Sequence, residues 1–298
     1  MIAGECKLCK NSCELELSHF VPKFVGKWLK KTSITGFFRK GNEINKREQD
    51  LEKEYWLCGK CEDLFSVWET KFANNVFYPF VDKGISTANY EDWLSKFCAS
   101  LTWRTLTYIK SINSATSDLK NIENDLLAAE NHLAKYLLGE LSSLNQYEQH
   151  LIPLEKIDSY TYKDMPPNIN RYFLRTVAMD IVTGEGNIFV YTKIPSFILL
   201  GVVKSKHSGE MRASRIALKS GKLSPRTYTF PSGLGGYICT SAEKVSEAYS
   251  KIKPEDLKKF EAYIENNFEK VSNSKLLEAI LYDYEMFGAE STLQVAEE

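Results

Sequence analysis

The sequence predicts an α+β protein whose N-terminal part is a zinc-bound module, and three observations lead to this fold class. Two Cys-x-x-Cys pairs stand within the first 61 residues. Apolar residues then recur at helical spacing over residues 83–150. From about residue 151 the pattern changes to alternation and short apolar runs, which are typical of antiparallel strands joined by turns. We therefore expect a zinc-binding module over 1–82, a helical region over 83–150 and an α+β domain over 151–298, with helices flanking an antiparallel sheet.

The composition narrows the class of protein. The net charge of −1 argues against a globally basic nucleic-acid coat, although a local basic patch remains compatible with it. No apolar run reaches the length of a membrane span, and the first residues lack the apolar stretch of a signal peptide. We therefore expect a cytoplasmic protein with no membrane contact. In a reducing compartment, closely spaced cysteines are better explained as metal ligands or redox groups than as disulfides.

The two cysteine pairs are Cys6 with Cys9 and Cys58 with Cys61. A two-residue gap lets both sulfurs of a pair reach one ion, so that two pairs can form a tetrahedral thiolate shell around Zn²⁺. We expect a structural zinc here, and a redox pair is the alternative. Cys13 is a possible substitute for Cys9, which makes the second pair the more secure one.

The segment between the pairs predicts a basic helix. Phe20, Phe24 and Trp28 recur every four residues and mark its apolar face. Four lysines form the opposite stripe: Lys23, Lys27, Lys30 and Lys31. Residues 20–47 contain eight basic residues and a single acidic one. A strip of this kind attracts a phosphate backbone, so the sequence favours nucleic acid as a partner, and DNA in particular.

Helices are expected next over 64–76, ended by Pro79, and then over 93–109 and 119–137. Two isolated cysteines, Cys98 and Cys239, are expected to be small buried apolar residues. Strands are expected over 171–182, 188–194 and 197–203, with a further pair over 214–219 and 226–230. The glycine-rich stretch 233–236 predicts a turn, and helices follow over 241–252, 254–268 and 274–287. His150 and His207 stand alone in the sequence and are expected on the surface.

The first 80 residues resemble the HNH endonuclease family, whose treble-clef, or ββα-metal, core is often wrapped by two zinc knuckles. The resemblance is carried by CKLC at 6–9, HFVP at 19–22, Asn45 in NKREQD, and LCGKC at 57–61 opening a helix. The stretches around 18–41 and 57–80 are also similar to a group of bacterial proteins with an HNH-like N-terminus. An HNH-like domain joined to a distinct C-terminal region further resembles the layout of anti-phage and mobile-element nucleases, which suggests antiviral defence as one possible role.

The resemblance implies a role for particular residues. His19 matches the general base that activates water for attack on a phosphodiester. Asn45 matches the residue that orients this histidine, and Glu62 takes the place of the family's last histidine, a ligand of Mg²⁺ or Mn²⁺. One departure is Ser18, which stands where the family usually has an acidic metal ligand. Glu69 lies seven residues beyond Glu62 and could add a second oxygen, although a solvated helix charge is the simpler interpretation.

Two classes of function follow. The first is a metal-dependent HNH-type endonuclease that hydrolyses phosphodiester bonds of DNA, or of RNA, with a C-terminal region that senses a signal, selects substrate or binds a partner. The alternative is a zinc-stabilised nucleic-acid-binding or regulatory protein without catalysis. A structural interaction protein, which binds a protein partner or forms a homo-oligomer through its C-terminal region, is a third possibility.

Overall fold

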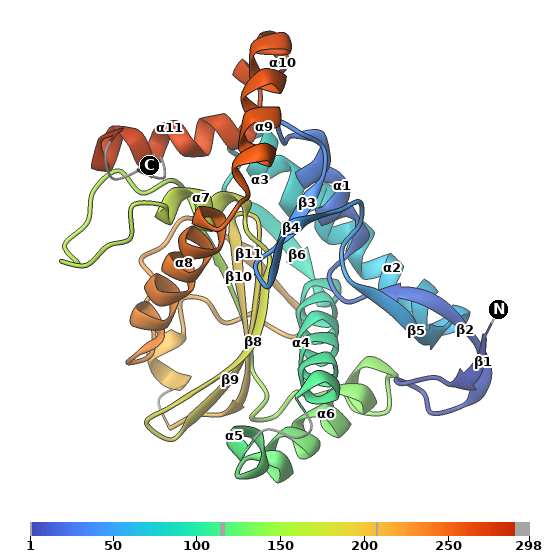
Figure 1. Cartoon of the computed structure of the whole chain (residues 1–298). Coiled ribbons are helices and arrows are strands. Elements are labelled where there is room, and N and C mark those ends of the chain that lie inside the picture. The colour runs from blue at the N-terminus through green and yellow to red at the C-terminus, as the bar shows by residue number, and fades with distance from the viewer. Residues whose placement is uncertain (1, 114–116, 207, 290–298) are drawn as a thin grey trace. The chain divides into compact units, whose positions relative to one another are not determined.

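The computed structural model describes residues 2–113, 117–206 and 208–289 and has the expected α+β fold (Figure 1). The chain divides into two compact units. Unit 1 comprises Met1–Pro22, Glu52–Pro153 and Val177–Ser232, and unit 2 comprises Lys23–Leu51, Leu154–Thr176 and Gly233–Glu298. The three regions expected from the sequence, 1–82, 83–150 and 151–298, are each one continuous stretch. Each unit of the structure instead combines three separated stretches.

Unit 1 begins with a small antiparallel sheet in the order β1–β2–β5. The strands are β1 (Ile2–Glu5), β2 (Ser12–His19) and β5 (Lys53–Cys58). The first cysteine pair lies in the turn between β1 and β2, and the second lies where β5 passes into helix α2 (Gly59–Phe72).

The helical run after β5 continues beyond its expected end. Helix α2 is followed by a π-helical turn, η1 (Ala73–Phe77), and then by α3 (Tyr78–Lys83). The prediction that Pro79 ends the helix was wrong, because the helical run passes through the π-helical turn η1 and this proline lies in the first turn of α3. Gly84, with a φ of 65°, ends the run instead.

The central helices are α4 (Asp92–Ile112), α5 (Ser117–Lys120) and α6 (Glu123–Leu137). The expected helix over 93–109 is confirmed, whereas the expected helix over 119–137 is divided into α5 and α6. Cys98 is buried in α4, as predicted.

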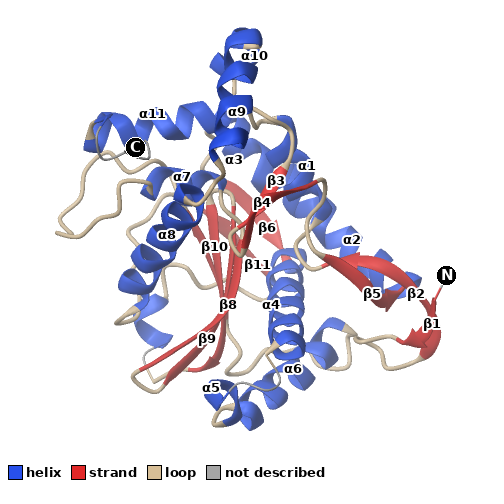
Figure 2. Cartoon of the chain, viewed as in Figure 1, coloured by secondary structure: helices blue, strands red, loops and turns tan. Residues whose placement is uncertain are grey.

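A four-stranded antiparallel sheet in the order β7–β10–β9–β8 forms the core of unit 1 (Figure 2). Its strands are β7 (Gln149–Pro153), β8 (Ala178–Gly184), β9 (Asn187–Ile194) and β10 (Phe197–Lys204). Helix α4 contacts all four strands. The Thr105 and Thr192 hydroxyls, 2.7 Å apart, join α4 to β9, and Thr102 donates to Gln149 Oε1 at 2.6 Å. The helix is therefore fixed to the sheet by polar contacts as well as by apolar packing.

The remaining part of unit 1 pairs β6 (Ala88–Glu91) with β11 (Ser220–Leu223) and contains the short helix η2 (Ser208–Met211). The predicted strands over 214–219 and 226–230 were wrong. Residues 214–216 run beside β7, but they form only an isolated bridge between His150 and Arg215. His207 lies outside the described residues.

Unit 2 combines helices with one hairpin. From the first stretch come α1 (Lys23–Lys31), β3 (Phe38–Lys40) and β4 (Glu43–Glu48). The later stretches supply α7 (Ile169–Arg175), α8 (Leu234–Ser250), α9 (Pro254–Asn266), α10 (Phe268–Ser272) and α11 (Lys275–Phe287). The turn expected over 233–236 is limited to Gly233, because α8 begins at Leu234. Cys239 of α8 is buried, as predicted.

Two charged side chains hold unit 2 together. The buried Asp283 carboxylate of α11 accepts hydrogen bonds from the backbone N–H groups of Asn170 and Arg171, at 2.7 and 3.1 Å. It thereby caps α7, which explains why residues 171–175 are helical where the sequence pattern predicted a strand. Arg175 donates to the Leu29 carbonyl at 3.1 Å and to Thr32 Oγ1 at 2.7 Å, and so satisfies acceptors at the end of α1.

Among the described residues, no helix is both long enough and apolar enough to cross a membrane.

Candidate metal centre

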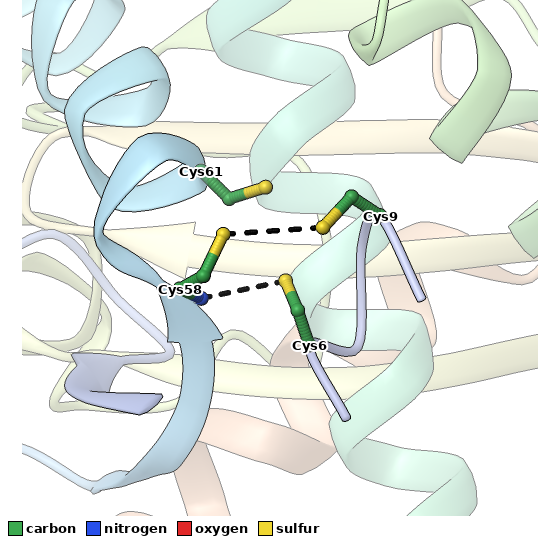
Figure 3. A group of neighbouring side chains, drawn as sticks. All are labelled: Cys6, Cys9, Cys58 and Cys61. Atoms are coloured by element: carbon green, nitrogen blue, oxygen red, sulfur yellow. Dashed lines mark hydrogen bonds between the residues drawn. The ribbon is translucent and has the colours of Figure 1, made fainter. Parts of the chain in front are cut away.

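Four cysteine thiols converge in unit 1, and they are the four that the sequence predicted. The sulfur atoms of Cys6, Cys9, Cys58 and Cys61 all lie within 4.8 Å of one another. Figure 3 shows them facing a common centre, two from the loop after β1 and two from the junction of β5 and α2. Residues separated by some fifty positions therefore meet at one point because β2 pairs with both β1 and β5.

The spacing of the sulfurs fits a tetrahedral ion. Zinc–sulfur bonds of about 2.3 Å place the sulfurs of a tetrahedral site about 3.8 Å apart. The Cys9 and Cys58 sulfurs are 3.9 Å apart, and all seven cysteines are free thiols rather than disulfides. A four-cysteine donor set of this geometry is compatible with a bound zinc ion, which would be held by four thiolates and would join the two knuckles.

The backbone around the centre stabilises negative charge on the Cys6 sulfur, whereas burial raises the pKa of the Cys9 and Cys61 thiols. The Cys58 N–H points at the Cys6 sulfur at 3.4 Å. Burial raises the pKa of the Cys6 thiol, but backbone N–H groups of Cys9, Cys58 and Leu8 outweigh burial and hold this pKa at about 7. A thiol with a lowered pKa yields the thiolate that a metal requires.

Cys13, the possible substitute for Cys9, is outside the converging set. Its thiol donates to the Asn11 carbonyl at 3.4 Å. Burial raises the pKa of the Cys13 thiol, and negative charge on Cys58 and Cys6 raises it further. Cys13 therefore lies near the centre without sharing it. The first knuckle closes through Lys10, whose φ of 62° lets its N–H reach the Cys6 carbonyl at 2.9 Å.

His19 is the last residue of β2 and pairs in register with Lys53 of β5. The residue before it, Ser18, is buried, and its hydroxyl accepts from the Leu57 N–H at 3.2 Å and donates to the Glu16 carbonyl at 3.3 Å. Ser18 thus stabilises the β2–β5 pair. Its hydroxyl is used by the backbone and is not presented as a metal ligand.

A buried arginine joins the His19 backbone to helix α2. Arg104 of α4 donates from Nη1 to the His19 carbonyl at 3.2 Å and forms an ion pair with Glu69 Oε1 at 2.8 Å. Burial raises the pKa of Glu69, while Arg104 opposes the rise, and His19 lies close enough to oppose it as well. The interpretation of Glu69 as a solvated charge was wrong, because its side chain is only 19% exposed and is paired.

Glu62 lies in the first turn of α2, immediately after Cys61, and is half-buried. Seven residues of helix separate it from Glu69, a rise of about 10.5 Å. Glu62 nevertheless lies close enough for its negative charge to add to the rise in the pKa of Glu69. Within residues 2–113, 117–206 and 208–289, the four cysteines form the only group of three or more histidine, cysteine, aspartate or glutamate side chains whose ligand atoms converge.

Asn45 belongs to unit 2, not to the unit that contains His19. Its amide nitrogen donates to the Lys251 carbonyl at 3.1 Å, and its oxygen accepts from the Lys253 N–H at 2.9 Å. The side chain therefore joins β4 to the connection between α8 and α9. Nothing in these contacts supports the expected role of orienting His19.

The predicted basic stripe is present on α1. Lys23, Lys27 and Lys31 are exposed, whereas Lys30 is half-buried and donates to the Gln49 carbonyl at 2.8 Å. The opposite face of α1 is buried through Val25, Gly26, Trp28 and Leu29. Three of the four lysines are thus available to solvent in unit 2.

Sequence reasoning missed Arg104, the residue that contacts both His19 and Glu69. It lies in a helix whose apolar pattern predicts only core packing, and its partners are 35 and 85 positions away. An arginine within an otherwise apolar helical face was the one available signal.

Comparison of the chain with family models, curated proteins and solved structures gives no match in any of the three. What the sequence and the structure establish together is an α+β protein with a four-cysteine centre compatible with zinc. The resemblance to HNH endonucleases rests on the residues of the first 80 positions.

Proposed function

We propose that the chain is a metal-dependent endonuclease in which His19 acts as the general base. One observation carries the proposal: a single nitrogen of the buried Arg104 binds both the His19 carbonyl and the Glu69 carboxylate. The histidine is thereby held at the end of β2, a strand that pairs with β5 and follows the turn containing Cys6 and Cys9. A base that removes a proton from water must be positioned in this way.

The residues have separate roles in this proposal. His19 accepts the proton of the attacking water, and Arg104 and Glu69 are positioning residues that fix its backbone. Glu62 would hold a Mg²⁺ or Mn²⁺ ion, which supplies charge stabilisation at the phosphate when bound. Mg²⁺ is often held by one or two carboxylates together with water and substrate phosphate, so that a single protein carboxylate suits it. Asn45 has no role here, and Ser18 has only a structural one.

Nicking of supercoiled plasmid with Mg²⁺ and with Mn²⁺, and cleavage of a single-stranded RNA, test the proposal. His19→Ala is expected to abolish cleavage and to leave the zinc content and the circular dichroism spectrum unchanged. His132→Ala is the matched control, because His132 of α6 contacts the Ser143 carbonyl and the Tyr147 ring and has no role in the proposal. Equal cleavage by wild type and His19→Ala, or no cleavage by wild type with either metal, would refute the catalytic proposal.

The exposed lysines of α1 favour a second candidate, a zinc-stabilised nucleic-acid-binding protein without catalysis. In this case Lys23→Glu together with Lys27→Glu should weaken DNA binding and flatten its dependence on salt, since each phosphate contact releases counterions. Lys258→Glu, at an exposed lysine of α9, is the control substitution. Fluorescence anisotropy at several salt concentrations measures both effects, and His19→Ala should leave this binding unchanged.

A further inference from the structure

A small pocket of unit 1 lies apart from the residues used above. Its volume is about 170 Å³, and β6, β7, β11 and the segment after η2 contribute to its wall. The polar and charged side chains that line it are Tyr90, Ser214, Arg215, Lys222, Arg226 and Tyr228, with Ser224 beside them. None of the residues that line the pocket is acidic.

The positive charge of this pocket is only partly neutralised. Arg215 forms an ion pair with Glu148, whose Oε1 is 2.9 Å from its Nη1. The Lys222 ammonium group has no hydrogen-bond or ion-pair partner among the described residues. Arg226 donates only a long hydrogen bond, 3.4 Å, to Ser224 Oγ and meets no carboxylate in the described part of the chain. Two cations therefore border the pocket without a counter-charge.

The pocket wall is rigidly built. Gly221 of β11 pairs with Tyr90 of β6, and a Cβ at this glycine would lie 2.3 Å from Tyr90 Oη. The tyrosine can therefore lie across the strand only because residue 221 has no side chain. Its hydroxyl accepts the Ala217 N–H at 3.1 Å, which fixes the segment between η2 and β11.

A buried histidine supports the opposite wall. His150 of β7, which the sequence placed on the surface, is fully buried, and that prediction was wrong. It is covered because residues 214–216 run along β7, where the Leu151 N–H donates to the Ser214 carbonyl at 2.9 Å. His150 Nδ1 lies 3.0 Å from Ser214 Oγ, and this hydroxyl donates to the Met211 carbonyl at 3.0 Å, so Ser214 supports the pocket wall rather than a ligand.

We propose that this pocket binds a phosphate group carried by a small phosphomonoester or by the end of a nucleic-acid strand. Arginine and lysine bind phosphate through charge-assisted hydrogen bonds. The Tyr90 and Ser224 hydroxyls, which accept from the Ala217 N–H and from Arg226 Nε, can donate further ones. The volume is below the roughly 300 Å³ at which pockets for drug-sized ligands begin, so it suits a phosphate with a short attachment rather than a whole nucleotide. The site goes beyond the proposed nuclease function and does not depend on it.

Isothermal titration calorimetry of the full-length chain tests the proposal with four probes: inorganic phosphate, phenyl phosphate, and a dinucleotide with and without a 5′-phosphate. The double variant Lys222→Gln, Arg226→Gln should bind phenyl phosphate at least tenfold more weakly than wild type, because two charge-assisted contacts are lost. The matched control is Lys219→Gln, Arg212→Gln, which removes two exposed charges of the same segment that do not line the pocket. This control should change the dissociation constant less than twofold.

The probes separate the two sources of phosphate. Tight binding of phenyl phosphate indicates a small phosphomonoester, whereas preference for the 5′-phosphorylated dinucleotide over its 5′-hydroxyl form indicates a strand end, and either result supports the pocket. Dissociation constants weaker than about 1 mM for every phosphate probe would overturn it. An equal loss in the two double variants would overturn it as well. His19→Ala should bind all probes like wild type, so that failure of the nuclease proposal is distinguishable from failure of this one.

Discussion

Cys9 lies in the turn between β1 and β2, Cys13 is the second residue of β2, and only Cys9 faces the four-cysteine centre. The Cys9 sulfur is among the four that converge, whereas the Cys13 thiol donates to the Asn11 carbonyl. Cys9→Ser should therefore reduce the zinc content of the purified protein to well below one ion per chain, while Cys13→Ser should retain one. Elemental analysis after removal of weakly bound metal measures this. The reverse result would show that the knuckle closes through Cys13.

His150 gives unit 1 a stability that depends on pH. Burial lowers the pKa of His150 to about 4, with the nearby Arg215 charge acting in the same direction. The folded state therefore binds fewer protons than the unfolded state between this pKa and the ordinary value near 6.5. Stability rises with pH through this window, and as the pH falls from about 6.5 to 4 unfolding becomes easier by about 3 kcal/mol.

Urea denaturation at pH 7, 5 and 4 measures the effect. His150→Gln should show a weaker decline in the free energy of unfolding over this range than wild type, because the substituted side chain does not titrate. His132→Gln is the control and should retain the wild-type decline. An equal decline in the free energy of unfolding for wild type and His150→Gln would contradict the lowered pKa of His150.

At the scale of elements, α4 approaches β10 more closely than any side chain at Gly201 would allow. A Cβ there would lie 2.1 Å from Thr102 Cγ2. Gly201→Ala should lower the free energy of unfolding of unit 1 by about 1–3 kcal/mol, since the helix must move away from the sheet. Gly209→Ala is the control, because open space surrounds this position. A stability of Gly201→Ala equal to wild type would show that the contact relaxes without cost.

The elements also show which sequence patterns suffice for prediction. Strands β9 and β10 and helices α4 and α11 were predictable, because the apolar residues of each follow a clear pattern over its length, that of a strand in β9 and β10 and that of a helix in α4 and α11. Residues 171–175 were assigned to a strand because their apolar run is short and fits either period. The helix forms there because a carboxylate 112 or more positions away caps its N–H groups. Local pattern contains no information about such a contact.

At the scale of the whole chain, the four cysteine ligands were predictable because their spacing is itself the chemical signature. The division into units was not, because each unit joins stretches that only tertiary contacts bring together. Arg104 and the buried position of His150 were missed for the same reason. Their roles depend on partners that lie far along the sequence.

The N-terminal module depends on residues beyond position 82. In unit 1, Phe20 stacks on Tyr108 with ring centroids 4.1 Å apart, and Trp56 and Phe65 both contact Trp103. A fragment of residues 1–82 would expose these aromatic rings and should lack a dispersed amide NMR spectrum even with zinc. The full chain is the reference. A well-dispersed spectrum of the fragment would show that the module folds alone.

The four-cysteine centre is the basis of the whole account, because it brings the turn before β2 to the junction of β5 and α2, and β2 ends at His19. X-ray absorption spectroscopy at the zinc edge of the full-length protein tests it most directly. We expect one zinc per chain with four sulfur ligands at about 2.3 Å. A chain that binds no zinc, or a zinc ion with fewer than four sulfur ligands, would contradict the account.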